Sequence, residues 1–511
     1  MSALRRYAPR RPPEARRAPA AHVPPRLAKM PRMSEAAPTI SARHLAALRA
    51  VLGPGGYLDA AADRAPFEVD FRGLYHGHTP LVALPDSTTR VTEFVSYCAA
   101  HGIAIVPHGG NTSYCGGATP GAGGNEIVLS LRRLNRIRSV DVPSDSISAE
   151  AGCVLAALQD AAAAAGRLLP MSLGSAGSCT LGGIISTNAG GTSVLRYGMM
   201  RELVLGLEVV LPDGRVLNQL RGLRKDNTGY DVKQLFIGAE GTLGIVTAAC
   251  IRLVPRPAGR STAMVALESP AAALRLLAEL RSAIGSAVAS FELIPRTALE
   301  FVSRHMAGAR DPFAAAHPWY VLVEVELPQP DSDLAARFES ALAAAIDAGR
   351  VIDAVTASSE AQREALWQLR ESIPEAQRRA GGGLKHDISV EPGRLPQFID
   401  EGRALVERLA PAARLVAYGH LGDGNLHFNV SAPHGDDGST LVAAGDAIRR
   451  AVHDLVARHG GSISAEHGIG RLKVAELERY EDPVALDLMR AIKRTLDPRG
   501  IMNPGKVLRD R

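Results

Sequence analysis

One short stretch, residues 418–429, restricts the folding of this chain more than any other. It reads Tyr-Gly-His-Leu-Gly-Asp-Gly-Asn-Leu-His-Phe-Asn and has strand-like sequence on both sides. Asp423-Gly424 is a two-residue turn signal, so the flanking segments are predicted to pair as a β-hairpin. Because the chain then folds back on itself, His420 and His427 are expected to lie near one another across the turn.

A second polar segment, residues 465–468, reads Ala-Glu-His-Gly and completes the pattern. Two His and one Glu form a set of nitrogen and oxygen ligands that suits zinc, manganese or iron(II), with positions left open for a substrate oxygen. We therefore predict a divalent metal site, with zinc as the first choice, held by His420, His427 and Glu466. His467 is not needed as a ligand and is predicted to act as a base, since an imidazole titrates near neutral pH. The alternative is a glycine-rich hairpin with surface histidines.

A cofactor site is predicted from three clusters of glycine and small polar residues. The first, residues 107–113, reads Pro-His-Gly-Gly-Asn-Thr-Ser and follows a predicted buried strand at residues 103–106. Glycines after a strand let backbone N–H groups approach an anion closely, and a nest of such groups suits a pyrophosphate. The second cluster, residues 172–191, is so rich in small and hydroxyl side chains that a flat, polar ligand is expected against it, and residues 237–247 complete the set. No G-x-G-x-x-G leaves a strand and opens a helix, so the common nicotinamide-dinucleotide fingerprint is missing.

These motifs together resemble a known family. Gly-His-Leu-Gly-Asp-Gly-Asn-Leu-His, followed about forty residues later by Ala-Glu-His-Gly-Ile-Gly, is similar to the C-terminal domain of FAD-linked D-2-hydroxyacid dehydrogenases of the vanillyl-alcohol-oxidase flavoprotein superfamily. The likeness runs from about residue 75 to the end and includes D-2-hydroxyglutarate dehydrogenases, D-lactate dehydrogenases and the catalytic subunit of glycolate oxidase. It implies oxidation of a D-2-hydroxy acid to the 2-oxo acid, with hydride transfer to FAD and metal-assisted activation of the hydroxyl.

The resemblance also implies which residues hold the cofactor. The first glycine cluster would contact the FAD pyrophosphate, and the later two would line its isoalloxazine and adenosine ends. The FAD is expected to be non-covalent, because Asn111 stands where covalently flavinylated relatives often have a His. The residues predicted to bind FAD are His108, Gly109, Gly110, Asn111, Thr112, Ser113, Gly174, Gly177, Ser178, Thr180, Gly183, Asn188, Gly190, Glu240, Gly241, Ile245, Asn425 and Asn503.

Two cations are predicted to bind the substrate carboxylate. Arg370 offers a bidentate guanidinium and Lys385 a point charge, and both match the family's positions. Asn429 is expected to assist them. Pro374 stands where 2-hydroxyglutarate enzymes tend to have Thr, so recognition of a second, distal carboxylate is left open.

The element order and the resemblance together predict an α+β fold. Residues 1–33 are predicted to be a disordered basic tail, and residues 34–256 an N-terminal two-part FAD-binding domain. Residues 257–511 are expected to form the substrate-binding domain, in which two βαβ units build a ferredoxin-like antiparallel sheet. A helical C-terminal cap follows, residues 462–465 are predicted to be a strand that delivers Glu466 and His467, and the last segment is expected to return towards the flavin.

Charge argues against nucleic-acid binding by the folded part. Residues 1–33 hold 9 Lys and Arg against 1 acidic residue, whereas the rest of the chain holds 49 basic and 52 acidic residues. The positive net charge of +5 therefore belongs to the tail, and the body is mildly acidic. An Arg-rich targeting segment, a nucleic-acid tail and a start codon assigned too early are the open alternatives for this tail.

Cysteine usage and hydropathy limit the compartment in which the protein is expected and the partners to which it could pass electrons. The five cysteines include no Cys-x-x-Cys pair, which fits a reducing compartment and argues against an iron–sulfur cluster in this chain. Electrons would then leave through an electron-transfer flavoprotein, a quinone or a cytochrome. No run of about eighteen apolar residues could span a bilayer, so a cytoplasmic protein, peripheral to the inner membrane at most, is expected. A homodimer is also compatible with the sequence.

Three other functions use the same fold. One is a glycolate oxidase-type subunit of a multi-protein complex. Another is a redox-neutral flavoenzyme such as an alkylglycerone-phosphate synthase, which is expected to carry a His-rich run where this chain has residues 465–467. The third is a non-catalytic FAD-binding subunit, for which a degraded metal and base set is expected.

Overall fold

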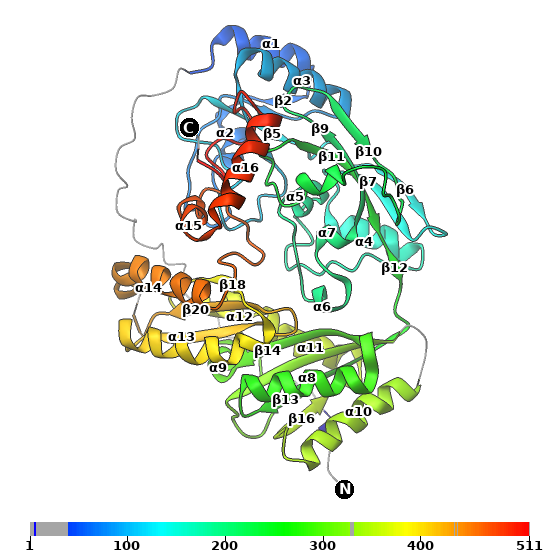
Figure 1. Ribbon diagram of the computed structural model, residues 1–511, viewed down its shortest axis with the longest axis vertical. Helices are drawn as coiled ribbons and strands as arrows, with labels where there is room; N and C mark the ends of the chain where they lie inside the picture. Colours follow the sequence, from blue (N-terminus) through cyan, green and yellow to red (C-terminus); the bar gives the residue numbers. More distant parts are fainter. Residues whose placement is uncertain (1–4, 7–38, 328–331, 434, 437, 510–511) are drawn as a thin grey trace.

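The computed structural model describes residues 5–6, 39–327, 332–433, 435–436 and 438–509 (Figure 1). The upper part of Figure 1 contains the elements from α1 to β12 together with the last two helices, and the lower part contains the elements from β13 to α14. The mixed helix and sheet content confirms the predicted α+β class. The connection between the two parts follows β12, Val254–Pro255.

A small, mainly parallel sheet carries the first glycine cluster. Its strand order is β2-β3-β5-β4, and β4 runs parallel to β5. Ser41 and Ser87 cap the two helices beside it, and Gly102 ends the second in a left-handed conformation. The elements are α1 Ala42–Leu52, β2 Tyr57–Leu58, α2 Ala61–Arg64, β3 Val82–Ala83, α3 Thr88–His101, β4 Ala104–His108 and β5 Glu126–Ser130.

An antiparallel sheet of order β10-β9-β11-β7-β6 forms the second half of this part. Strand β9 pairs with β10 across the turn Pro212-Asp213-Gly214. A single apolar core joins both sheets. The elements are β6 Ile137–Asp141, β7 Ser146–Glu150, α4 Leu155–Ala164, β8 Arg167–Leu168, α5 Leu181–Ser186, α6 Val194–Tyr197, α7 Met200–Leu203, β9 Val204–Val210, β10 Val216–Gln219 and β11 Ile245–Arg252.

The lower part is built on a long sheet whose described strands follow the order β1-β16-β13-β15-β14-β19-β20-β17, with β18 also paired to β20. The central order β16-β13-β15-β14 is the ferredoxin-like arrangement that was predicted, and these pairs are antiparallel. The strands are β1 Arg5–Arg6, β13 Gly259–Leu267, β14 Val288–Pro295, β15 Trp319–Leu327, β16 Asp353–Thr356, β17 Gly383–Leu384, β18 Asp387–Ser389, β19 Arg414–His420 and β20 Asn425–Ser431.

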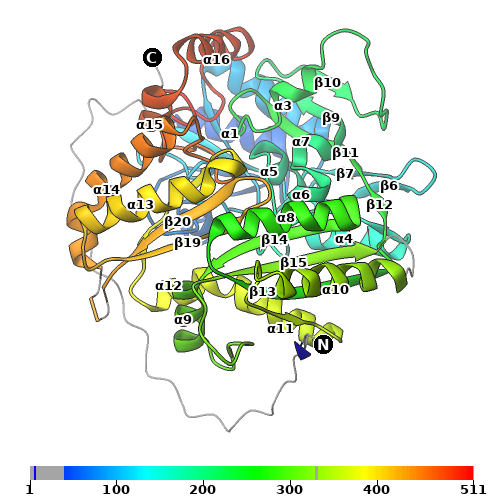
Figure 2. The same ribbon diagram turned by 60° about the horizontal axis from the view of Figure 1, so that its bottom comes forward.

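Helices cover both faces of this sheet, since its strands are apolar on both sides. Ala263, Val265 and Leu267 of β13 pack in one core with α8, α10, α13 and α14, whereas Met264 and Ala266 pack in the other with α9, α11 and α12. Figure 2 shows α8 and α10 lying across the first face. The helices are α8 Pro270–Ile284, α9 Arg296–His305, α10 Ser332–Asp347, α11 Glu360–Glu371, α12 Ile373–Arg379, α13 Leu395–Leu409 and α14 Ser439–Arg458.

The chain returns to the upper part after α14. Helices α15 (Val474–Tyr480) and α16 (Pro483–Leu496) lie there, drawn in red in Figure 1. Residues 497–506 follow, and the backbone N–H of Asn503 donates to the carbonyl of Ile105 in β4 (2.8 Å). The predicted return of the C-terminal segment is therefore observed. Among the described residues, no helix combines the length and apolar character that crossing a bilayer requires.

Three local predictions need comment. Asp423-Gly424 lies in the turn, as expected: β19 and β20 are joined by the four residues 421–424, and their ladder begins at the pair Tyr418–His427. Residues 462–465 do not form a strand, because only Ser462 pairs, in an isolated bridge with Ser389. The predicted disordered tail lies mostly outside the described residues, but Arg5–Arg6 form the short strand β1 beside β16, contrary to that prediction.

Candidate active site

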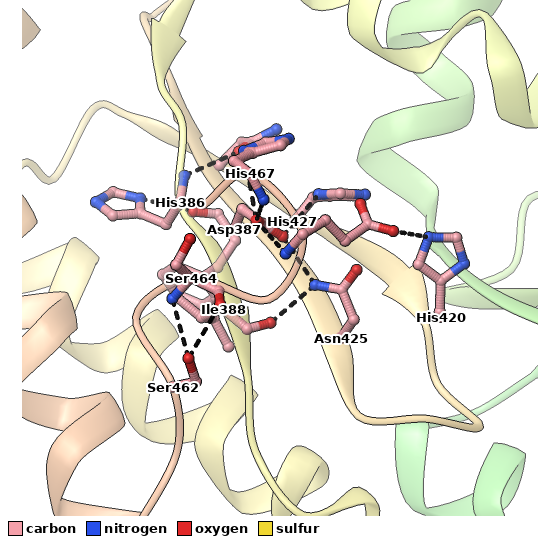
Figure 3. A network of polar contacts seen from close by, with 12 residues as sticks. His386, Asp387, Ile388, His420, Asn425, His427, Ser462, Ser464 and His467 are labelled. Atoms are coloured by element: carbon pink, nitrogen blue, oxygen red, sulfur yellow. Dashed lines mark hydrogen bonds and ion pairs between the residues drawn. The ribbon is translucent and has the colours of Figure 1, made fainter. Parts of the chain in front are cut away.

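Asp387 on β18 is the centre of a buried polar network (Figure 3). Its Oδ2 accepts hydrogen bonds from the backbone N–H groups of Glu466 (2.8 Å) and His467 (2.9 Å). Its Oδ1 accepts a hydrogen bond from Nδ2 of Asn425 on β20 (2.9 Å). One carboxylate thus holds the 465–468 segment against the hairpin without the strand that had been predicted.

The structure brings the three predicted metal ligands together. One ligand atom each from His420, His427 and Glu466 lies within 4.8 Å of the others. Nε2 of His420 is 3.7 Å from Oε1 of Glu466, and the two imidazole centroids are 5.8 Å apart. The hairpin therefore places both histidines near one another, as expected.

Glu292 on β14 supports this cluster and was not predicted from the sequence. Its carboxylate accepts hydrogen bonds from Nδ1 of His420 (2.6 Å) and Nε of Arg370 (2.8 Å). The side chain is 1% exposed, so both contacts are shielded from water. Since Nδ1 is engaged, His420 can offer only Nε2 to a metal ion. A lone acidic residue in an apolar strand was the available signal for this role.

The predicted base lies beside the ligands. Nδ1 of His467 is 3.4 Å from Oδ2 of Asp387, and its ring packs edge-on against Tyr114 with centroids 4.6 Å apart. Asp387, Glu466 and His467 form a second group of potential ligand atoms that shares Glu466 with the first. The base is therefore held by a carboxylate on one side and an aromatic ring on the other.

The three predicted substrate-binding residues differ in their surroundings. Arg370 is buried beside Glu292, with its guanidinium 4.8 Å from the centre of the Tyr418 ring. Lys385 is exposed and lies between β17 and β18. Asn429 is buried and donates from Nδ2 to Oε1 of Gln377 (3.0 Å), so its amide is partly engaged within the protein.

Burial and neighbouring charges shift the titration of this cluster. Burial alone would raise the pKa of Glu292, but His420 and Arg370 lower it to about 2. Burial would lower the pKa of His420, but Glu292 raises it to about 9. Burial raises the pKa of Glu466 to about 7 and lowers the pKa of His467 below its ordinary value.

A cavity of about 580 Å³ connects the glycine clusters with this site. All three clusters line it, and Glu466 and His467 line it as well. The predicted FAD-binding residues that line the cavity are His108, Gly109, Gly110, Asn111, Thr112, Ser113, Gly174, Ser178, Thr180, Gly183, Gly190, Glu240, Gly241 and Ile245. Segments far apart in the sequence therefore meet around one space, with the predicted base in its wall.

The remaining predicted cofactor residues lie outside the lining. Gly177 and Asn188 belong to the second cluster, and Oδ1 of Asn188 accepts the N–H of Arg201 (2.9 Å). Asn425 belongs to the Asp387 network, and Asn503 donates from Nδ2 to the carbonyl of Glu240 (2.8 Å). Phe71 and Tyr114 also line the cavity and were not predicted from the sequence, because neither belongs to a glycine motif.

The walls of the cavity fit a large, flat, anionic cofactor. A Cβ on Gly110 would lie 2.1 Å from the carbonyl oxygen of Ser178, so the two backbone segments meet as closely as they can. Asn111 and Glu240 hold left-handed backbone conformations, which non-glycine residues adopt at a cost and mostly near functional sites. Both ring nitrogens of His108 are buried and have no protein partner among the described residues, so a polar ligand in the cavity could satisfy them.

The donor set also fits a divalent cation. Two imidazoles and a carboxylate whose pKa is raised by burial lie within 4.8 Å of one another, where a positive ion would compensate the charge of the carboxylate. The carboxylate of Glu292 fixes the orientation of His420 from outside, as supporting residues do in metal sites.

Comparison with known proteins agrees with this geometry. Residues 79–219 match the family described as FAD binding domain, and residues 256–507 match the family described as FAD linked oxidases, C-terminal domain. The chain is 41% identical to mitochondrial D-2-hydroxyglutarate dehydrogenase of Bos taurus, over 92% of this chain and 84% of that protein. It is 39% identical to D-2-hydroxyglutarate dehydrogenase of Xanthomonas citri pv. viticola, over 83% of this chain and 88% of that protein.

Solved structures share the fold at lower identity. p-Cresol methylhydroxylase with substrate bound superposes with a TM-score of 0.73 at 18% identity, covering 91% of this chain and 96% of that one. Alkyldihydroxyacetonephosphate synthase gives a TM-score of 0.70 at 18% identity, covering 91% of this chain and 85% of that one. Because the FAD-binding domain and the FAD-linked oxidase C-terminal domain both match, and because relatives of 39–41% identity align over 83–92% of its length, the chain belongs to the family of FAD-linked oxidases that includes the D-2-hydroxyglutarate dehydrogenases.

Proposed function

We propose that the protein is an FAD-dependent dehydrogenase that oxidises a D-2-hydroxy acid, of the D-2-hydroxyglutarate or D-lactate class, to the 2-oxo acid. The observation that carries this proposal is that the cavity lined by all three glycine clusters also has Glu466 and His467 in its wall. A cofactor in that cavity would lie next to a base and a metal-ligand set. The relatives' names, D-2-hydroxyglutarate dehydrogenase and putative D-lactate dehydrogenase, support the same reaction and the D configuration.

When bound, non-covalent FAD would supply a hydride acceptor. A divalent ion would supply a Lewis acid for the substrate hydroxyl, and the types of the three ligands favour zinc. His420, His427 and Glu466 are the residues that would hold the ion. The glycine clusters would hold the flavin. Glu292 would keep Nε2 of His420 turned towards the ion, since its carboxylate occupies Nδ1.

Within this arrangement His467 removes the hydroxyl proton. Oδ2 of Asp387 lies 3.4 Å from Nδ1 of His467 and stabilises the imidazolium that forms. The same carboxylate oxygen also accepts a hydrogen bond from the backbone N–H of His467. Arg370 attracts the substrate carboxylate. Glu292 bonds Nε of Arg370, and no described residue accepts a hydrogen bond from its terminal guanidinium nitrogens, so these can contact the carboxylate. Lys385 adds a second positive charge, and Asn429 lines the same face of β20 as His427.

The alternative functions are less well supported. The fold shared with alkyldihydroxyacetonephosphate synthase makes a redox-neutral reaction a candidate. This chain, however, has Ala-Glu-His at 465–467 in place of a His-rich run, and its metal and base set is complete. For the same reason a non-catalytic FAD-binding subunit is disfavoured, whereas a glycolate oxidase-type subunit would use the same residues.

Several finer points belong to the proposal. We infer a boundary between two domains near residue 256, since the match to the C-terminal oxidase domain begins there and β13 starts a new sheet.

An electron-transfer flavoprotein, a quinone or a cytochrome is the proposed electron acceptor, and a homodimer is the proposed assembly. The relatives from Arabidopsis thaliana and Bos taurus are named as mitochondrial proteins, so the cytoplasmic, membrane-peripheral location stays a prediction.

An anaerobic visible spectrum of the purified protein tests the proposed reaction. A flavin band that is bleached by D-2-hydroxyglutarate, D-lactate, D-malate or glycolate, and survives the L-enantiomer of a chiral acid, supports it. Protein that contains flavin and metal but is bleached by none of these acids would contradict the proposal. Protein purified without any flavin would contradict the cofactor assignment itself.

A further inference from the structure

Glu240, in the third glycine cluster, binds the segment that carries the predicted base. Its Oε1 accepts a hydrogen bond from the backbone N–H of Ile469 (2.7 Å), and its Oε2 accepts one from the backbone N–H of Gly470 (2.8 Å). Among the described residues, no Lys, Arg or His lies within ion-pair distance of this carboxylate. Glu240 therefore lines the cofactor cavity while both of its carboxylate oxygens bind the protein backbone.

Two carboxylates from different parts of the molecule thus hold one short segment, residues 466–470. Asp387, on β18 in the lower part of Figure 1, accepts the N–H groups of Glu466 and His467. Glu240 belongs to the upper part and accepts the two N–H groups at the other end of the segment. The predicted base is therefore fixed between the two parts, in the wall of the cavity.

The contact between Glu240 and this segment leaves no room for a side chain. Gly468 has a φ of +72°, and a Cβ there would lie 2.7 Å from Oε1 of Glu240. Gly470 has a φ of +51°, and a Cβ there would lie 2.2 Å from the carbonyl oxygen of Cys115. The same carbonyl accepts a hydrogen bond from the N–H of Arg471 (2.9 Å). The segment is therefore packed closely against the third glycine cluster and against the chain just after the first.

Glu240 is itself held firmly in the upper part. Its φ of +51° is a left-handed conformation, which a non-glycine residue keeps only where the surroundings enforce it. Its N–H donates to the carbonyl of Ser186 at the end of α5 (2.8 Å), and its own carbonyl accepts a hydrogen bond from Nδ2 of Asn503 (2.8 Å). Ser186 also lines the cavity, so the wall of the cofactor cavity and the base-bearing segment share one rigid contact.

We propose that Glu240 is a positioning residue that fixes residues 466–470 to the wall of the cofactor cavity and thereby aligns His467 with a substrate beside the flavin. This inference rests on the proposed function and assigns Glu240 no contact with the substrate. Glu240→Gln tests it with almost no change in size. The single carbonyl oxygen of Gln can accept one N–H group, and its NH₂ group would face the other, so one bond is replaced by an unfavourable contact.

A double-mutant cycle separates positioning from a general loss of structure. The limiting rate of flavin reduction is measured by stopped flow in the wild-type holoenzyme, Glu240→Gln, His467→Gln and the double variant, with the D-acid that bleaches the wild type best. Glu240→Gln is expected to lower this rate roughly 10- to 100-fold, because a small misplacement of a reacting group has a cost of that order. The half-saturating acid concentration should stay near the wild-type value, since Arg370 attracts the substrate carboxylate from α11.

In the His467→Gln background, adding Glu240→Gln should change the rate little, because no base is left to misplace. Hydrogen–deuterium exchange checks the contact without turnover. The N–H groups of Ile469 and Gly470 should exchange faster in Glu240→Gln than in the wild type, whereas β18 should stay protected.

A second variant disturbs the same contact from the side of the segment. Gly468→Ala should reproduce the slower flavin reduction and the faster exchange, and Gly468 does not line the cavity, so the test does not depend on flavin retention by Glu240→Gln. The control is Asp482→Asn. This exposed carboxylate also accepts two backbone N–H groups, at the start of α16, and Asn caps a helix equally well, so wild-type behaviour is expected.

An equal loss of rate in the wild-type and His467→Gln backgrounds would indicate a structural role alone and overturns the inference. Unchanged exchange of the two N–H groups in Glu240→Gln, or wild-type rates in both Glu240→Gln and Gly468→Ala, also overturns it. Each of these results leaves the proposed function standing when a D-acid bleaches the wild type. A wild type that is bleached by no acid overturns both.

Discussion

Nδ1 of His420 lies 2.6 Å from Oε1 of Glu292, a residue 128 positions earlier in the chain. The same carboxylate binds Nε of Arg370, so one buried group on β14 orients a proposed metal ligand and a proposed substrate cation. β14 and β19 are neighbours in the ferredoxin-like sheet, with Glu292 paired directly to His420. The sheet topology thus supplies what the hairpin sequence alone lacks.

We expect Glu292→Gln to lower metal affinity by roughly 10- to 100-fold, because the amide cannot match a carboxylate in orienting the imidazole. Metal content by elemental analysis at limiting metal concentration is the measurement. Glu300→Gln, in the exposed part of α9, should keep wild-type metal content. Full metal binding in Glu292→Gln would contradict a role for this carboxylate in the site.

His467→Gln is expected to slow flavin reduction roughly 10²- to 10⁴-fold, the range that a general base contributes. The variant should remain folded, flavin-bound and metal-loaded, since its backbone bond to Asp387 does not depend on the side chain. Stopped-flow absorbance with the preferred D-acid measures the rate. His101→Gln, at the exposed end of α3, should behave as the wild type, and a normal rate in His467→Gln would contradict the assignment.

Local sequence predicted the parts of the site that depend on neighbouring residues. His420 and His427 belong to one hairpin, so the turn signal between them was sufficient to predict that they lie close together. Beyond the end of the hairpin ladder at Tyr418, Gly419 and His420 pair with β14, which the local sequence did not predict.

Long-range contacts were not predictable from the same signals. Glu292, Asp387 and Tyr114 act through residues more than seventy positions away, and a single sequence contains no record of which strands become neighbours. Residues 462–465 look like a strand locally. In the fold, Asp387 accepts hydrogen bonds from the N–H groups of Glu466 and His467, and these bonds take the place of pairing with a neighbouring strand.

Gly110→Ala is expected to reduce bound FAD strongly. Its Cβ would lie 2.1 Å from the carbonyl oxygen of Ser178, so one of the two segments that line the cavity must move. The ratio of flavin to protein absorbance after purification and the midpoint of thermal unfolding are the measurements. Gly393→Ala, where a Cβ would have no neighbour within 4 Å, is the matched control. Wild-type flavin content in Gly110→Ala would show that the close approach does not shape the cofactor site.

Glu208→Gln tests how the N-terminal part is held together. The carboxylate is 7% exposed and accepts hydrogen bonds from Thr88 (2.7 Å), Thr247 (2.8 Å) and Arg138 (3.2 Å). Burial would raise its pKa, but Arg138 and the two hydroxyls lower it below the ordinary value of 4.5. We expect Glu208→Gln to reduce the free energy of unfolding of this part by about 1.5–3 kcal/mol at pH 7, the range for hydrogen bonds to a charged group.

The pH dependence of this difference gives the sharper test. Because the pKa of Glu208 is lower in the folded protein than in the unfolded chain, its stabilisation is fully present above about pH 4.5 and is lost as the pH falls through the folded value. Urea unfolding midpoints of the wild type and Glu208→Gln should therefore differ at pH 7 and converge on acidification. Glu268→Gln, at an exposed position, should track the wild type at every pH. A gap that stays the same in acid would mean that side-chain packing, and not the charge of Glu208, accounts for the stabilisation.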